Sequence, residues 1–232
     1  MNVHRIQAIF EKDLKDFMKN MMLLMMPTIP IILALLYSRL GKGDEELPLF
    51  MLYMIVGITF STVTSSCMMT MMAEENEKKT LRGLVLSPAS FIDILVGKSL
   101  VTGLMTAISL VISLLIAGID PFLAVKPIIG MVLLFLFFLF LGIGIGLFAK
   151  TVAATSAYLM PVMFLFGFTP MFNLLGIDED SIVTKIINVF PLPQLIKMHE
   201  DGSWFPLGIV LIWVIAAAAF MALCFRKRST DD

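Results

Sequence analysis

Gly97-Lys98-Ser99 are the residues of this sequence that most resemble a nucleotide-binding motif, because they match the end of a phosphate-binding loop. The full loop has the pattern G-x-x-x-x-G-K-[ST], in which the first glycine permits a tight turn that aims backbone N–H groups at phosphate. Ile92 occupies the position of that glycine. The loop should also follow a β-strand, whereas these residues lie in a long apolar run. We therefore predict that this chain has no nucleotide site of its own.

Other catalytic chemistry has equally few candidates in this chain. His4 and His199 are the only histidines and lie far apart, which argues against a metal site and a Ser–His pair. Cys67 and Cys224 both lie in apolar runs, so we expect buried thiols rather than a disulfide. We predict that the chain is not an enzyme and has no catalytic or metal-binding residues.

The composition is that of an integral membrane protein. Hydrophobic residues make up 59% of the chain and charged residues 15%, with a mean hydropathy of +0.95. An ordinary soluble domain has about 45–50% apolar and about 25% charged residues. A soluble chain of 232 residues could not cover this much apolar surface. The net charge of −1 argues against nucleic acid as a partner, since that partner requires a basic face.

Six apolar runs are long enough to cross a bilayer, whose hydrocarbon core needs about 20 residues per helix. They lack the alternation of barrel strands, so we predict an all-α protein with six transmembrane helices. The runs are Met21–Leu40, Leu49–Ala73, Phe91–Gly118, Pro127–Ala149, Val152–Leu175 and Phe205–Phe225. Residues 21–225 would form the membrane domain, and 226–232 a cytoplasmic tail. Within the third run, we expect Lys98 to extend its ammonium to the headgroups.

The distribution of Lys and Arg predicts the orientation of the chain, because cytoplasmic loops are enriched in both. Twelve of the 17 lie on the side of both termini and of the loop after the second run, and five lie on the other side. Both termini should therefore be cytoplasmic, in a cell membrane that we take to be a bacterial plasma membrane.

Residues 1–20 have the pattern of an amphipathic helix. Apolar residues recur at three- and four-residue steps with charged residues between them, and they include Ile6, Phe10, Leu14 and Phe17. We predict a helix that lies in the cytoplasmic interface of the membrane. The alternative is a loosely packed cytoplasmic helix.

Residues 74–90 form a loop with a short amphipathic turn of its own. Thr80, Leu81, Leu84 and Val85 supply an apolar edge, and Glu77, Lys78 and Arg82 supply charge. An apolar edge in water needs a cover, which could be another protein or the membrane surface.

The segment EKKTLRGLVLSPASFIDILVGKSL resembles the cytoplasmic loop of ABC-2 type permeases, the membrane subunits of ABC exporters. In that family a Glu-x-Gly-Thr-Leu-x-x-Leu turn precedes Ser-Pro and a Gly-Lys pair at the start of the third helix. The matching residues are Glu77, Thr80, Leu81, Leu84, Ser87, Pro88, Gly97 and Lys98. Pro161, Gly167, Pro170 and Pro191 echo the family's later Pro…Gly…Pro pattern. Lys79 replaces the usual glycine.

The resemblance implies that the loop is a coupling helix that docks on a separate ABC ATPase subunit, which binds ATP and Mg. The N-terminal helix would be the connecting helix at the same interface. Two permease copies, or two related permeases, would surround the translocation path. The family also implies that residues 176–204 form short re-entrant helices in the outer leaflet; the alternative is a simple surface helix.

Two groups of residues within the runs could shape a path, and a third could pack helices together. Thr59, Thr62 and Ser66 belong to a hydroxyl-rich stretch that either joins helices or lines a polar cavity. Pro161 and Pro170, like Pro27 and Pro30, should kink or interrupt their helices. Gly142 and Gly146 form a small-xxx-small face for close helix packing.

The most consistent function is an exporter permease for an amphipathic or hydrophobic substrate, such as a peptide toxin, a bacteriocin-like peptide or a drug. The resemblance extends to exporters of phenol-soluble modulins. A secondary transporter would usually carry ionisable residues within its spans, which are nearly absent here. A membrane scaffold or immunity protein that transports nothing is the other alternative.

Overall fold

The computed structural model describes residues 3–40, 47–78, 91–175 and 181–230, and these residues are helical with no β-strand among them. The α-helices are α1 (Val3–Lys19), α2 (Met21–Met25), α3 (Thr28–Leu40), α4 (Leu49–Ile58), α5 (Ser66–Glu77), α7 (Phe91–Ala117), α8 (Val125–Phe148), α9 (Val152–Val162), α10 (Ile182–Ile187), α11 (Pro191–Asp201) and α12 (Phe205–Thr230). Thr59–Ser65 (η1) and Met163–Gly167 (η3) are π-helical. Asp120–Phe122 (η2) and Thr169–Leu175 (η4) are 3₁₀-helical.

Within the described residues, five helical stretches are long and apolar enough to cross a membrane. They are Met21–Arg39, Leu49–Glu77, Ile92–Ala117, Val125–Phe148 and Phe205–Lys227. The remaining expected span is shorter as a regular helix, because its apolar part ends at Gly167 and the chain continues as the 3₁₀-helix η4. The all-α membrane fold is therefore confirmed with five long spans. The sixth crossing, by Val152–Leu175, stays a prediction.

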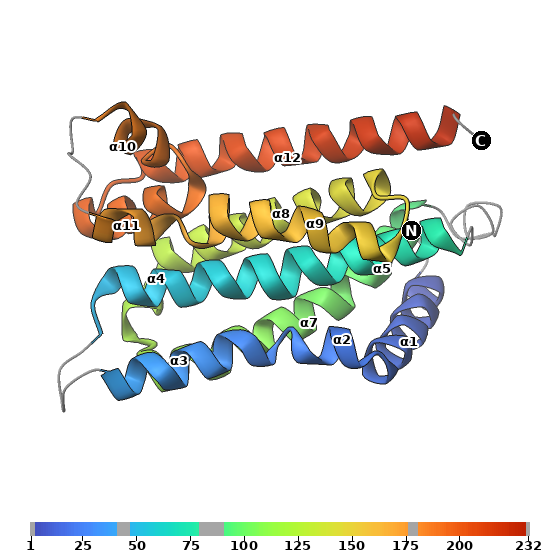
Figure 1. Cartoon of the computed structure of the whole chain (residues 1–232), viewed down its shortest axis with the longest axis horizontal. Helices are drawn as coiled ribbons and strands as arrows, with labels where there is room; N and C mark the ends of the chain where they lie inside the picture. The colour runs from blue at the N-terminus through green and yellow to red at the C-terminus, as the bar shows by residue number, and fades with distance from the viewer. Residues whose placement is uncertain (1–2, 41–46, 79–90, 176–180, 231–232) are drawn as a thin grey trace.

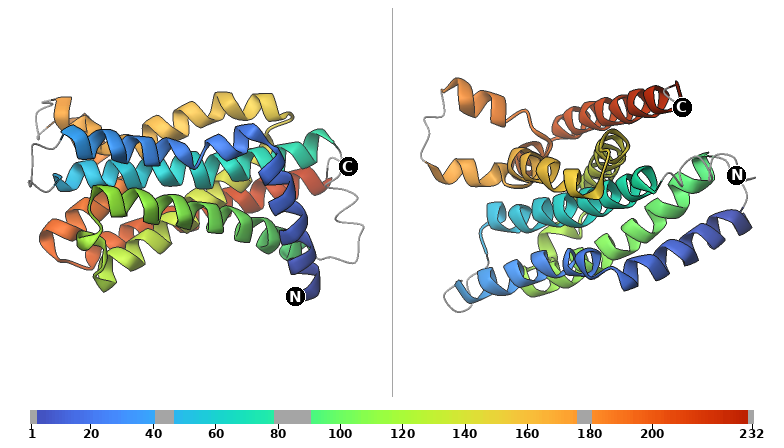
Figure 2. Two further views of the ribbon diagram at one scale, coloured as in Figure 1. Left: turned by 90° about the horizontal axis from the view of Figure 1, so that it is seen from below. Right: turned by 45° about the vertical axis from the view of Figure 1, so that its right-hand side comes forward.

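The helices lie side by side along one axis, except α1, which crosses the end of the bundle at a steep angle (Figures 1 and 2). We call the end that holds α1, the last turn of α5 and the α8–α9 turn the α1 end. The opposite end, which holds α10 and α11, is the α11 end. Both termini lie at the α1 end (Figure 1).

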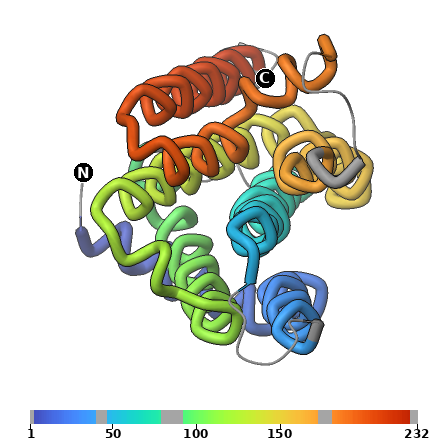
Figure 3. Tube along the Cα trace, turned by 90° about the vertical axis from the view of Figure 1, so that its left-hand side faces the viewer, coloured from blue at the N-terminus to red at the C-terminus, as the bar shows by residue number. Residues whose placement is uncertain are grey.

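The second span, formed by α4, η1 and α5, is the central helix of the bundle (Figure 3). In its most apolar stretch of 18 residues, 83% of the residues are buried within this single chain, against 17% in the first span and 22% in the last. The first span packs on α7, and α12 packs on α8, so these helices flank the centre. Because the second span contacts most of the others, any displacement of it must be passed on to its neighbours.

The second span extends further than its hydropathy indicates. We expected the loop to begin at residue 74, but α5 remains helical through Glu77. Glu75 and Asn76 are buried, and their side-chain contacts offset the cost of removing these polar groups from water. A hydropathy scale counts that cost but not the contacts. The described part of the loop is therefore a continuation of the central helix.

Two of the expected helix interruptions coincide with prolines. The first span is broken at Met26-Pro27, between α2 and α3. Pro161 lies inside α9, and the chain stays helical for one more residue before the π-helical segment η3. Pro170 lies in the first turn of η4, where a missing N–H leaves no helical hydrogen bond unmade.

Candidate functional site at the α1 end

Helix α1 packs closely on the start of α7, where Gly97 permits the contact. A Cβ atom at Gly97 would lie 2.7 Å from Cγ2 of Ile9, so any larger residue would push α1 away. Ile6 and Phe17 of α1 are 8% and 1% exposed, and Phe10 and Leu14 are partly buried. Phe17 packs with Leu23, Val63, Cys67, Met71 and Val101, which connects α1 to the first three spans.

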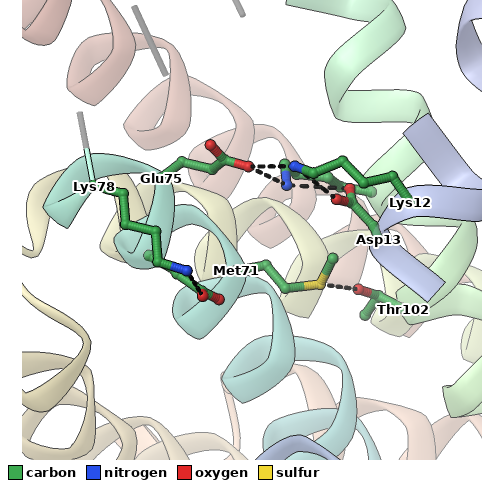
Figure 4. A network of polar contacts seen from close by, with 8 residues as sticks. Lys12, Asp13, Met71, Glu75, Lys78 and Thr102 are labelled. Atoms are coloured by element: carbon green, nitrogen blue, oxygen red, sulfur yellow. Dashed lines mark hydrogen bonds and ion pairs between the residues drawn. The ribbon is translucent and has the colours of Figure 1, made fainter. Parts of the chain in front are cut away.

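A buried ion cluster joins α1, α5 and α7 (Figure 4). Nζ of Lys98 lies 3.1 Å from Oδ2 of Asp13 and 3.0 Å from Oε1 of Glu75. These three residues are 2%, 3% and 6% exposed, respectively. At the rim, Nζ of Lys12 lies 3.6 Å from Oε1 of Glu75 and 3.7 Å from Oδ1 of Asp13. Two cations thus face two carboxylates, which leaves the cluster close to neutral.

The expectation that Lys98 extends to the headgroups was wrong. Its ammonium points into the protein because two carboxylates lie within ion-pair distance, and α1 covers the site. A buried charge needs paired and hydrogen-bonded partners to offset its desolvation. Gly97 and Lys98 therefore have a packing role and a pairing role in attaching α1, rather than a role in phosphate binding.

Lys12 and Lys78 lie outside the spans at this end and keep their positive charge. Burial lowers the pKa of Lys12, but the negative charges of Glu75, Asp13 and Asp16 outweigh burial, so the pKa lies above its usual value. The hydrogen bond from Lys78 to Glu74, one turn earlier on α5, raises the pKa of Lys78. Neither lysine loses its charge near neutral pH.

The last turn of α5 also holds the turn between α8 and α9. The two N–H bonds of the Asn76 amide are shared among the carbonyl oxygens of Gly146, Leu147 and Ala149, which lie 3.1, 3.0 and 3.2 Å from Nδ2. Oε2 of Glu77 accepts a hydrogen bond from the backbone N–H of Val152 at 2.8 Å. Asn76 and Glu77 therefore satisfy backbone groups that the end of α8 and the start of α9 leave without helical partners.

Only the first two of the expected coupling residues are described. Glu77 ends α5 and Lys78 caps it, and both side chains are exposed. The remaining predicted coupling residues, Thr80, Leu81, Arg82, Leu84, Ser87 and Pro88, lie outside the described residues. Their role stays a prediction.

The expected path residues of the second span are buried within the single chain. Thr59, Thr62 and Ser66 are 0%, 2% and 3% exposed. Thr59 and Thr62 donate to the carbonyl oxygens of Ile55 and Ile58 in the preceding turn, and Ser66 contacts the sulfur of Met26. Thr64 pairs with Thr106 of α7 at 2.9 Å. Within one chain these hydroxyls bond to helices rather than to an open cavity.

Glycines set the distances between the second span and its neighbours. A Cβ at Gly142 would lie 2.7 Å from the carbonyl oxygen of Ser65, and one at Gly146 would lie 2.7 Å from Cβ of Met72. A Cβ at Gly57 would lie 2.5 Å from the carbonyl oxygen of Gly167, where α4 crosses η3. Helix α8 (span 4) and the segment formed by α9 and η3, part of the expected span Val152–Leu175 (span 5), thus approach the second span at backbone distance.

Residues 182–201, in the segment expected to be re-entrant, contain two short helices with different surroundings. Leu192, Leu195 and Met198 of α11 belong to the main hydrophobic core. Helix α10 has no buried residue, and Ile182 and Ile186 are exposed.

The two cysteines are free thiols, with Cys67 buried.

The apolar helices and the helical bundle define a multi-pass membrane protein. Residues 42–225, most of the chain, match the family model described as ABC-2 family transporter protein. The chain therefore belongs to the ABC-2 family, the membrane subunits of ABC transporters, which work with an ABC ATPase subunit and generally lack a nucleotide site. No curated protein matches the chain.

Sequence reasoning missed Asp13, Glu75 and Asn76. Asp13 falls on the apolar stripe of α1, in step with Ile6, Phe10 and Phe17. A carboxylate on a buried stripe and a lysine within a span predict each other as partners, and this signal was present. Asn76 offers no such signal, because its three acceptors are backbone carbonyls.

Proposed function

We propose that this chain is the permease subunit of an ATP-driven exporter, coupled through its α1 end to a separate ATPase subunit that binds ATP and Mg. The α1 end would be cytoplasmic, in agreement with the excess of Lys and Arg there. Two permease chains, identical or related, would pair around the path in the plasma membrane. Residues 1–20 would be the connecting helix and residues 74–90 the coupling loop.

The observation that supports this proposal is the convergence of polar contacts on the last turn of α5. Glu75 pairs with Lys12 of α1 and Lys98 of α7, and Asn76 and Glu77 bond to the α8–α9 turn. The segment that resembles the family's coupling helix follows this turn directly. A force applied to that segment would thus reach several spans through short, directional bonds.

The mechanism is a rigid-body relay. ATP closes the ATPase dimer, the docked segment and α1 follow, and the spans tilt to exchange inward and outward access. The described spans carry many exposed apolar side chains, so a path between two chains would suit an amphipathic or hydrophobic substrate such as a peptide toxin or a drug. Pro161 and Pro170 would let the fifth span bend during the exchange.

Reconstitution with the ABC ATPase that co-purifies with the chain tests the proposal. Proteoliposomes should accumulate a dye-labelled amphipathic helical peptide only with ATP and Mg, and the peptide should stimulate hydrolysis. Replacement of Leu81 or Leu84 by Asp should uncouple hydrolysis from transport without preventing membrane insertion. Leu123→Asp is the matched control, because Leu123 is an exposed leucine at the α11 end.

Two results would contradict the proposal. Transport of the peptide without any ATPase would favour a secondary transporter. Wild-type transport rates in both the Leu81→Asp and Leu84→Asp variants would show that residues 74–90 are not the coupling loop. A scaffold or immunity protein would give no peptide transport and no stimulation of hydrolysis.

A further inference from the structure

Three consecutive residues at the end of α5 bind to different parts of the bundle. Glu75 pairs with Lys98 of α7, which also pairs with Asp13 of α1. Asn76 and Glu77 bind to the α8–α9 turn. We infer that Asn76 and Glu77 are positioning residues that make the start of span 5 move with the end of α5. This inference rests on the proposed function.

The amide group of Asn76 acts as a donor to the end of α8. Its Nδ2 lies within 3.2 Å of three carbonyl oxygens, those of Gly146, Leu147 and Ala149. Asn76 is 5% exposed, so water cannot easily replace this bond. The Oδ1 atom has no hydrogen-bond partner in the part of the chain that the structure describes, so the contact uses the donor half of the side chain. An aspartate here would place a carboxylate against three carbonyl oxygens.

Glu77 holds the other side of the same turn. Its carboxylate accepts the backbone N–H of Val152, the first residue of α9, where the helix dipole favours a negative charge. Thr151 also caps α9, since its Oγ1 accepts the N–H of Ala154 at 3.2 Å. The two caps differ in origin: Thr151 is local to α9, whereas Glu77 belongs to α5. Of these two caps, Glu77 is the one that can transmit a displacement from α5.

Span 5 is attached to the second span at a second level as well. Close to the α11 end, Gly57 of α4 meets Gly167 of η3 at backbone distance. Between the two attachment levels, both spans contain a π-helical segment, η1 in one and η3 in the other. Wide turns of this kind occur mostly as single-turn bulges and frequently at functional sites. A push at Asn76 and Glu77 would therefore bend span 5 between its two fixed levels.

The test compares variants of Asn76 and Glu77, which join α5 to the α8–α9 turn, with a variant of Thr151, the local cap of α9. Each is measured in the reconstituted complex. Asn76→Asp and Glu77→Lys should reduce peptide transport per ATP hydrolysed by about 5- to 150-fold, the range of typical coupling free energies. Glu77→Gln keeps an acceptor oxygen and should retain most of the coupling. Thr151→Ala removes a cap of α9 without separating α9 from α5, so its transport per ATP should stay close to that of the wild type.

The outcomes separate this inference from the proposed function. Wild-type coupling in both Asn76→Asp and Glu77→Lys, measured while the wild-type complex transports with ATP, would overturn the inference alone. An equal loss of coupling in Thr151→Ala would also overturn it, because it would assign the effect to α9 stability. Absence of ATP-driven transport by the wild-type complex would overturn both proposals. If Asn76→Asp fails to insert into the membrane, the comparison of Glu77→Lys with Glu77→Gln tests the inference, because the Glu77 side chain is exposed.

Discussion

The two ends of the bundle are held together by different forces. At the α1 end, charged and amide side chains make short contacts, as in the pairs of Lys98 with Asp13 and Glu75. At the α11 end, aromatic rings supply many of the contacts: the ring centroid of Tyr53 lies 5.2 Å from that of Phe122 and 6.2 Å from that of His199, both edge to face. Hydrogen bonds to backbone carbonyls, such as that from Trp213 to Val189, accompany them. The difference indicates which end is built to hold a fixed geometry.

Ion pairs and amide–carbonyl bonds are directional, and breaking one inside the protein leaves a costly unpaired group. Ring contacts tolerate offset and edge-to-face geometries over a range of distances. Helices at the α1 end should therefore move together, whereas the ring-packed elements at the α11 end can shift relative to one another. The backbone contact between Gly57 of α4 and Gly167 of η3 is the exception. An exporter driven from its cytoplasmic face would need this combination.

The largest effect is expected from breaking the ion cluster. Lys98→Met leaves Asp13 and Glu75 as facing buried carboxylates, so the protein should lose about 3–5 kcal/mol of stability. Thermal unfolding in detergent measures the loss. Lys126→Met is the control at the α11 end, where the lysine binds the carbonyl oxygen of Gly202 and lies over the Trp204 ring. Equal losses in the two variants would contradict the contrast between the ends.

A smaller effect is expected where the second and fifth spans cross. Gly57→Ala puts a methyl group 2.5 Å from the carbonyl oxygen of Gly167, and overpacking of this kind costs about 1–3 kcal/mol. Gly208→Ala in α12 is the control, because among the described residues no atom beyond its chain neighbours and the nearby backbone of α12 lies within 4 Å of that Cβ position. If Gly57→Ala unfolds at the same temperature as Gly208→Ala, the crossing is looser than described.

The aromatic end should tolerate the loss of a polar group. The Tyr53 hydroxyl is buried and has no hydrogen-bond partner among the described residues, so Tyr53→Phe removes an unsatisfied group. We expect stability to stay equal or rise by about 1 kcal/mol, with the ring contacts retained. A loss of stability in thermal unfolding would show that the hydroxyl is needed at this end.

The smallest effect belongs to the rim of the ion cluster. The side chain of Lys12 is 55% exposed, so Lys12→Ala should cost less than about 1 kcal/mol, and high salt should remove the difference. Unfolding at two salt concentrations checks this. A salt-independent cost as large as that of Lys98→Met would mean that Lys12 is part of the buried centre.

The membrane fold follows from composition alone, because long apolar runs have few alternatives in lipid. The sequence also indicated the family, through the segment between the second and third runs. It could not give the end of the second span, since hydropathy penalises Glu75 and Asn76 until their partners are known. Those partners, Lys98 and the carbonyls of α8, lie far away in sequence.

The ion cluster was only partly predictable. The position of Asp13 on an apolar stripe signals a buried partner. The identity of its partners, Lys98 and Lys12, depends on how α1 crosses α7, which the sequence does not specify. The hydrogen bonds of Asn76 go to backbone carbonyl groups, which every residue has, so no sequence pattern marks them.

The most direct test of the central claim is photo-crosslinking from the predicted coupling loop. A benzophenone side chain at Leu81, in cells that also produce the co-purifying ABC ATPase, should form an adduct with that ATPase. The same group at Leu123, at the α11 end, should form none. An adduct at Leu123 but not at Leu81, or labelling of Leu81 from outside intact cells, would contradict the account.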